Sequence, residues 1–233
     1  MMHSHRGLFV ALEGIDGAGK SATAEATGRL MEEVDFPIVA FSKQHPPVED
    51  SYIRQHLAKL REIIWEHPPD DPYYRLGQYH WIHLIASWFT AISHCAVVPM
   101  LERGENVLVD NWISKSLARM RLNPEVEFSY AKSLFREVPE PDLVVLLDVN
   151  PAIAGYRKST ITAIEAGNLL SDIGITLDNY IEYQTLLNEE LQLFAIKENW
   201  PVVNANGRTL HEVSSDVADI IKSAAERHFR GRM

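Results

Sequence analysis

The chain has 233 residues, of which 46% are hydrophobic and 23% charged, and its formal net charge is −10. This length suffices for one domain with a well-buried core, so residues 1–233 are expected to form a single domain. A chain this acidic does not attract phosphate backbones, which excludes a nucleic-acid polymer as the expected partner.

The sequence carries no pattern that directs the chain to a membrane. No uninterrupted apolar run reaches the roughly 18 residues of a membrane span, and residues 1–6 lead into a strand-like run instead of a signal-peptide core. The chain has one cysteine, Cys95, which cannot form an intramolecular disulfide. These features predict a cytoplasmic protein with no membrane partner.

Residues 14–21 match the phosphate-binding motif G-x-x-x-x-G-K-[ST] at every fixed position. The apolar run at 8–12 predicts a buried strand before the motif, and apolar residues at every fourth position predict a helix over 22–33 after it. A loop between such a strand and helix points backbone N–H groups and a positive helix end at an anion. We therefore expect a phosphate site here; a glycine-rich turn that binds nothing is the alternative.

The motif also assigns roles within the loop. Lys20 is expected to contact the outer phosphates, and the Ser21 hydroxyl to ligate a magnesium ion that is held mostly by phosphate and water. The expected nucleotide-binding residues are Gly14, Asp16, Gly17, Ala18, Gly19, Lys20, Ser21 and Ala22.

The next segments place a lysine at a strand end. Alternation and β-branching predict a second strand over 36–42, which prolines at 46–47 terminate, and a helix follows over 49–66. Lys43 lies at the end of this strand, where open parallel sheets bind ligands. It is a candidate for the acceptor phosphate, and a solvated loop lysine is the alternative.

Residues 73–103 form the longest predicted helix, and its apolar residues fall on more than one face. Such a helix covers the sheet with one side and leaves another apolar side, which favours a homodimer. Arg75 is a polar group on this helix that could reach a ligand; a surface role is the alternative.

Asp110 ends the third predicted strand, 106–110. A carboxylate at this place can hold magnesium through water or orient an acceptor oxygen. Alternatively, Asp110 caps the predicted helix over 114–121.

The remaining pattern predicts a helix over 127–137, a strand over 142–148, a short helix from Pro151 that includes Arg157, a long helix over 175–199, a strand over 201–205 and a last helix over 209–229. Residues 158–174 are uneven in pattern and contain two glycines, Gly167 and Gly174. This segment is expected to be a lid, which phosphoryl transfer needs to exclude water.

Residues 9–21 (FVALEGIDGAGKS) resemble the opening of thymidylate kinases, and further segments match that family in order and spacing: 99–104, 107–110, 116–118, 141–151 and 202–205. The resemblance implies an α/β, three-layer P-loop kinase fold with a five-stranded parallel sheet flanked by helices. It also implies transfer of the ATP γ-phosphate to dTMP with Mg²⁺. The family's acid at Asp16 is expected to bond an acceptor sugar hydroxyl.

The departures from the family fall on residues that handle the acceptor. The family's Asp-Arg-Tyr/Phe/His triplet is Asp110-Asn111-Trp112 here, a second arginine falls near Phe89, and the Tyr-Gln pair that would face thymine is Arg119-Met120. Each lost arginine forfeits a charge-assisted contact worth about 1.5–3 kcal/mol. We therefore predict that the acceptor site is altered and that dTMP is a poor substrate.

Two interpretations remain. The first is a magnesium-requiring, ATP-dependent kinase that acts on a nucleotide, a nucleoside or another small molecule; the second is a catalytically impaired nucleotide-binding regulator of the same fold. The expected catalytic residues are Lys20, Asp110 and Arg157, and the expected metal ligands are Ser21 and Asp110. The expected substrate-binding residues are Asp16, Lys43, Arg75, Asn111 and Arg119.

Overall fold

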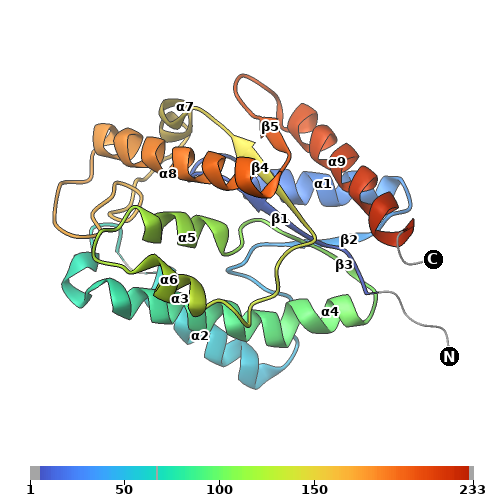
Figure 1. Ribbon diagram of the computed structural model, residues 1–233, viewed down its shortest axis with the longest axis horizontal. Coiled ribbons are helices and arrows are strands. Elements are labelled where there is room, and N and C mark those ends of the chain that lie inside the picture. The colour runs from blue at the N-terminus through green and yellow to red at the C-terminus, as the bar shows by residue number, and fades with distance from the viewer. Residues whose placement is uncertain (1–5, 67, 231–233) are drawn as a thin grey trace.

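Five parallel strands form the centre of the computed structural model, which describes residues 6–66 and 68–230 (Figure 1). Their order across the sheet is β2-β3-β1-β4-β5. The strands are β1 (Phe9–Glu13), β2 (Ile38–Phe41), β3 (Asn106–Val109), β4 (Leu143–Asp148) and β5 (Val202–Asn204). The predicted α/β architecture with a five-stranded parallel sheet is thus confirmed.

Strand β1 occupies the middle of the sheet because every one of its residues is apolar except the last, Glu13, and all are buried. It pairs with β3 on one side, Ala11 opposite Val109, and with β4 on the other, Glu13 opposite Leu146. The chain order reverses at β1, so the crevice beyond its carboxyl end is where an open parallel sheet binds its ligands. The glycine-rich loop begins at this point.

Helices cover both faces of the sheet, as a parallel sheet requires (Figure 1). They are α1 (Lys20–Glu33), α2 (Ser51–Trp65), α3 (Gln78–Ile92), α4 (Val98–Glu102), α5 (Ser114–Arg121), α6 (Phe128–Ser133), α7 (Pro151–Tyr156), α8 (Leu177–Glu198) and α9 (Leu210–Arg230). One hydrophobic cluster packs α1, α8 and α9 on the sheet, with Met31, Leu187 and Ile221 buried in it. The other packs α2 and α3, with Ile64 and Trp88 buried.

The long predicted helix over 73–103 is interrupted, so the prediction was wrong in its extent. Tyr73–Leu76 forms one 3₁₀ turn, η1, and Gly77 follows it with φ +74°, which no helix accommodates. A π turn, η2 (Ser93–Val97), joins α3 to α4. The helix predicted over 127–137 is also shorter, since α6 ends at Ser133 and turns lead to Pro139, which disfavours helix before it.

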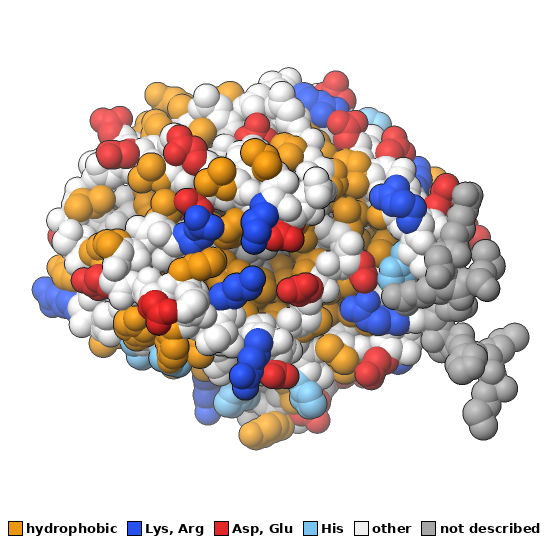
Figure 2. All heavy atoms as spheres, in the orientation of Figure 1, with side chains coloured by type: hydrophobic (Ala, Val, Ile, Leu, Met, Phe, Trp, Pro, Cys, Tyr) orange, Lys and Arg blue, Asp and Glu red, His pale blue; other side chains and the backbone are white. Residues whose placement is uncertain are grey.

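One stretch of the described residues, Gln78–Glu102, is long and apolar enough to span a membrane, with a mean hydropathy of 1.6. Half of it is buried inside the protein, and Trp88 and Ile92 are fully covered. Its composition therefore matches its position in the core. On the face seen in Figure 2, Lys and Arg side chains are interspersed with Asp and Glu and do not form a broad basic patch.

Candidate active site

A cavity of about 600 Å³ lies at the carboxyl ends of β1 and β3. It brings together residues from the glycine-rich loop, the end of β2, the end of β3, α5 and the segment after α7. The charged and polar lining includes Asp16, Lys20, Ser21, Lys43, Asp110, Asn111, Lys115, Arg119, Arg157, Lys158 and Glu165. Such a set of cations in one concave site suits a ligand with several phosphate groups.

The glycine-rich loop has the backbone that the motif predicts. Gly17 and Gly19 adopt φ +76° and +88°, and a Cβ on Gly17 would lie 2.7 Å from the carbonyl oxygen of Ala154. Lys20 folds back over the loop and donates to the carbonyl oxygens of Gly14 and Ile15, at 2.9 and 2.6 Å. Burial and the nearby charge of Lys115 lower the pKa of Lys20 to about 7. An anion in the loop would stabilise the protonated form.

Ser21 and Asp110 present two oxygens at one point. The Ser21 hydroxyl donates to Asp110 Oδ2 at 2.5 Å, and Asp110 Oδ1 accepts the backbone N–H of Lys43 at 3.1 Å. Hydroxyl and carboxylate oxygens are ligands that Mg²⁺ prefers. The described residues contain no group of three His, Cys, Asp or Glu that could hold a metal. The Ser21 and Asp110 oxygens would suit a magnesium ion that takes its other ligands from phosphate and water.

Lys43 lies beside Asn111 and close to two aromatic rings. Its Nζ donates to Asn111 Oδ1 at 2.5 Å and lies 5.4 and 5.7 Å from the ring centres of Trp65 and Phe89. Asn111 Nδ2 in turn donates to the fully buried Glu13 at 3.0 Å. Burial, followed by the charges of Lys115 and Arg119, lowers the pKa of Lys43 to about 7, and burial raises the pKa of Glu13.

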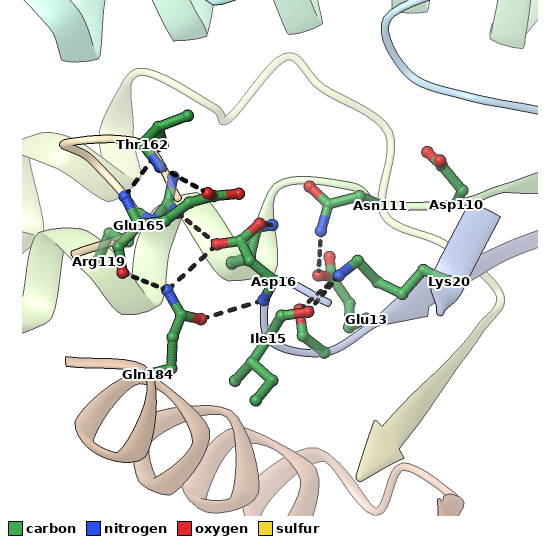
Figure 3. A network of polar contacts seen from close by, with 12 residues as sticks. Glu13, Ile15, Asp16, Lys20, Asp110, Asn111, Arg119, Thr162, Glu165 and Gln184 are labelled. Atoms are coloured by element: carbon green, nitrogen blue, oxygen red, sulfur yellow. Dashed lines mark hydrogen bonds and ion pairs between the residues drawn. The ribbon is translucent and has the colours of Figure 1, made fainter. Parts of the chain in front are cut away.

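Asp16 is held between two cations of α5. Its carboxylate accepts from Lys115 Nζ and Arg119 Nη2, each at 2.7 Å. Burial alone would raise the pKa of Asp16, but these two charges outweigh it and keep that pKa well below its usual range. In Figure 3, Arg119 and Gln184 reach Asp16 from the same side, and Lys20 lies against Ile15.

Gln184 of α8 links the loop to the segment 158–174. Its Oε1 accepts the N–H of Asp16 at 3.0 Å, and its Nε2 donates to Asp16 Oδ2 and to the Glu165 carbonyl oxygen, at 3.3 and 2.9 Å (Figure 3). The segment has no helix, and it is held by an ion pair within itself and by a backbone hydrogen bond to the chain before η1. Lys158 pairs with Glu165 at 2.9 Å, and the N–H of Ala163 donates to Pro69 at 2.7 Å.

The cavity gathers most of the residues that the sequence singled out: Asp16, Gly17, Gly19, Lys20, Ser21, Ala22, Lys43, Asp110, Asn111, Arg119 and Arg157. Gly14 and Ala18 belong to the loop, but the cavity lining does not include them. Arg75 is exposed on η1 and does not line the cavity.

Three buried polar residues of the site were missed by the sequence reasoning. Glu13 directly precedes the phosphate-binding motif at 14–21, and Lys115 directly precedes the matched segment 116–118, but neither residue is a fixed position of a motif. Gln184 offered a signal, because it interrupts the apolar stripe of the predicted helix over 175–199 at a core position. A polar residue at such a position needs a partner, and here the partner is the phosphate loop.

Comparisons with known proteins agree with this geometry. The family model for thymidylate kinase matches residues 12–216. A probable thymidylate kinase of Pyrobaculum aerophilum is 28% identical over 92% of this chain and 96% of its own length. A thymidylate kinase of Danio rerio is 26% identical over 94% of this chain and 92% of its own length, and a probable thymidylate kinase of Pyrococcus abyssi is 26% identical over 93% and 97%. The chain therefore belongs to the thymidylate kinase family and is an ATP-dependent kinase.

Proposed function

We propose that this protein transfers the γ-phosphoryl group of ATP to the phosphate of a nucleotide acceptor, with an acceptor pocket that differs from a thymidylate site. The observation that carries the proposal is the pair of lysines on the walls of one cavity, the buried Lys20 in the phosphate loop and the half-buried Lys43 beside Asn111. Two cations there match two phosphate-bearing ligands.

On the donor side, the loop amides and Lys20 bind the ATP phosphates. Ser21 and Asp110 hold Mg²⁺, which neutralises the charge that builds up on the phosphates during transfer. Both oxygens of Asp110 already accept hydrogen bonds, from Ser21 and from the Lys43 backbone. Asp110 therefore serves to orient the metal site rather than to remove a proton.

On the acceptor side, Lys43 binds the acceptor phosphate. Asn111 stands where the family has an arginine, and its carbonyl oxygen holds the Lys43 ammonium at 2.5 Å, so a cation is kept near that place. An oxygen of the acceptor phosphate attacks the γ-phosphorus, the bond to the β–γ bridging oxygen breaks, and ADP leaves. The attacking oxygen is already ionised, so no general base is required.

The acceptor base is proposed to differ from thymine. Arg119 projects toward Asp16 at the point where the cavity meets a smaller one of about 50 Å³, which Trp81, Ile85 and Met120 also line. The Arg119 guanidinium, which the ion pair with Asp16 holds in place, changes the shape and polarity of the pocket that would receive the acceptor base. This supports the prediction that dTMP is a poor acceptor.

The test is kcat/KM for dTMP beside a panel of nucleoside monophosphates, with ATP and Mg²⁺. We expect another nucleotide to exceed dTMP. If dTMP is best, with a value on the order of 10⁴ M⁻¹s⁻¹ or above, the altered specificity is wrong while the transferase function stands. If no acceptor supports turnover but ATP binds, the alternative of a nucleotide-binding regulator is correct.

The role of Lys43 is tested by Lys43→Met. Loss of one charge-assisted contact lowers kcat/KM for the best acceptor by about ten- to a hundred-fold, while ATP affinity is unchanged. Lys132→Met is the matched control, because Lys132 is exposed on α6 and outside the cavity. An equal loss in ATP affinity would instead place Lys43 on the donor side.

Two features of the whole protein belong to the same proposal. We place it in the cytoplasm, as a homodimer that buries the second apolar face of α3 and η2, where Leu84, Ala91 and Cys95 remain only half-buried. Sedimentation at micromolar concentration measures the mass, and a monomer would contradict the dimer.

A further inference from the structure

Helix α5 carries a buried ammonium onto the wall of the cavity. Lys115, the second residue of this helix, is 7% exposed, and its Nζ donates to Asp16 Oδ1 at 2.7 Å. Within residues 6–66 and 68–230, Asp16 is the one hydrogen-bond partner of this group. An ammonium has three donors, so two are left for a ligand in the cavity that Lys115 lines.

Hydrogen bonds link the start of α5, where Lys115 lies, to Lys20 on the ATP side and to Lys43 on the acceptor side. On one side, the N–H of Ser114 donates to Glu13 at 3.1 Å, and the same carboxylate holds Asn111, which holds Lys43. On the other side, Asp16 directly follows Ile15, whose carbonyl oxygen accepts from Lys20 at 2.6 Å. Two carboxylates therefore link the start of α5 to the two sides of the proposed transfer. Glu13 links it to the acceptor side, and Asp16 links it to the donor side.

The electrostatic effect of Lys115 on both lysines agrees with a position near each of them. After burial, the positive charge of Lys115 is the next largest cause of the lowered pKa of both Lys20 and Lys43. Lys158 pairs with Glu165 at 2.9 Å, and Arg119 shares Asp16 with Lys115, so both of these cations also have a carboxylate partner. Arg157 is exposed at the end of α7.

We propose that Lys115 is a catalytic residue that binds the phosphoryl group while it passes from ATP to the acceptor. The inference rests on the proposed function. As the bond to the β–γ bridging oxygen breaks and the bond to the acceptor oxygen forms, charge spreads over the three oxygens of the transferred group. An ammonium near both Lys20 and Lys43 that contacts these oxygens better in the transition state than in either ground state raises kcat.

The competing role is positional, in which Lys115 only holds Asp16 and so shapes the loop. The two roles differ in kinetics. A group that binds the phosphoryl group in transit affects kcat and leaves ATP affinity and the acceptor KM nearly unchanged. A group that acts through Asp16 has no further effect once the Asp16 charge is removed.

The experiment compares Lys115→Met with wild type, using ATP, Mg²⁺ and the fastest of dTMP, UMP, CMP, AMP and GMP. We expect kcat to fall by about 100-fold, with ATP affinity and acceptor KM within about three-fold of wild type. Lys132→Met, an exposed lysine on α6, is the control and retains kcat. Lys115→Arg keeps the charge and should recover part of the loss; it also replaces the Met variant if that variant fails to fold.

The second measurement is a cycle with Asp16→Asn. Lys115→Met must lower kcat by at least ten-fold in the Asp16→Asn background as well. No further loss in that background, or an unchanged kcat in the single variant, overturns the inference and leaves the proposed function intact. If wild type turns over none of the five nucleotides, the proposed function fails and the inference fails with it.

Discussion

Lys20 lies across its own loop, and the two carbonyl oxygens that it contacts stand in for the phosphates that the motif binds. With a pKa of about 7, this lysine is about nine-tenths neutral at pH 8 in the free protein. ATP phosphates raise that pKa, because they favour the protonated ammonium.

Binding of ATP at pH 8 should therefore take up close to one proton. At pH 6 the lysine is already protonated and the uptake should vanish. Calorimetry with Mg²⁺ and ATP, in two buffers of different ionisation enthalpy, measures the number of protons at each pH. No proton uptake at pH 8 would show that Lys20 is already charged in the free protein.

Asp110 is a second residue whose contacts predict a specific loss. Asp110→Asn keeps the shape of the side chain and removes the charge that the Ser21 hydroxyl and the Lys43 N–H contact. Turnover should fall by about 100-fold or more, ATP affinity by much less, and more Mg²⁺ should be needed for half-maximal rate. Steady-state rates over a magnesium titration measure this, and a rate equal to wild type would show that the Asp110 carboxylate only holds Ser21 and the Lys43 backbone in place.

The sequence predicted the residues whose roles depend on local geometry, and missed those that depend on packing. Lys20 and Ser21 follow from one motif, and Asp110 from the end of a buried strand. Lys115 and Gln184 are separated from Asp16 by 99 and 168 residues. Only the folded arrangement of α5 and α8 against the loop brings them to it. Arg75 was a reasonable candidate by type, but Gly77 separates η1 from α3 and leaves Arg75 exposed.

Helix α8 joins the phosphate loop to the segment 158–174 through Gln184. Gln184 is fully buried and makes all its side-chain hydrogen bonds to these two regions. A side chain of similar size without polar atoms would leave the Asp16 N–H and the Glu165 carbonyl oxygen without this partner. Element boundaries alone could not have indicated the link, because it depends on one face of a helix that was otherwise predicted as core.

Gln184→Leu should lower the free energy of unfolding by about 1–3 kcal/mol, the cost of buried polar groups that lose a hydrogen bond. Denaturant unfolding measures the loss. Gln192→Leu is the matched control on the same helix, since the Gln192 side chain has no hydrogen bond to another described residue. Equal stability of the two variants would show that water replaces Gln184 without cost.

At the scale of the whole molecule, charge is separated between surface and site. The net charge is −10, yet six cations line the cavity at the carboxyl ends of β1 and β3: Lys20, Lys43, Lys115, Arg119, Arg157 and Lys158. The carboxylates in the same lining are Asp16, Asp110 and Glu165. An acidic exterior repels long polyanions, whereas a concave, locally cationic site accepts small ones. The composition predicted the acidic exterior, whereas the cationic site could be recognised only from the fold.

The central position of β1 has a consequence for amide hydrogen exchange. Backbone groups of Val10 and Ala11 are paired on both sides, to β3 and β4, whereas β5 pairs on one side only. Amides of β1 should exchange only when the entire protein unfolds, and those of the helix-free segment 158–174 orders of magnitude faster. Exchange followed by mass spectrometry tests this, and similar rates in both segments would contradict it. The strand that unfolds last is also the one that ends in Glu13 and starts the phosphate loop, so partial opening elsewhere leaves the cradle assembled.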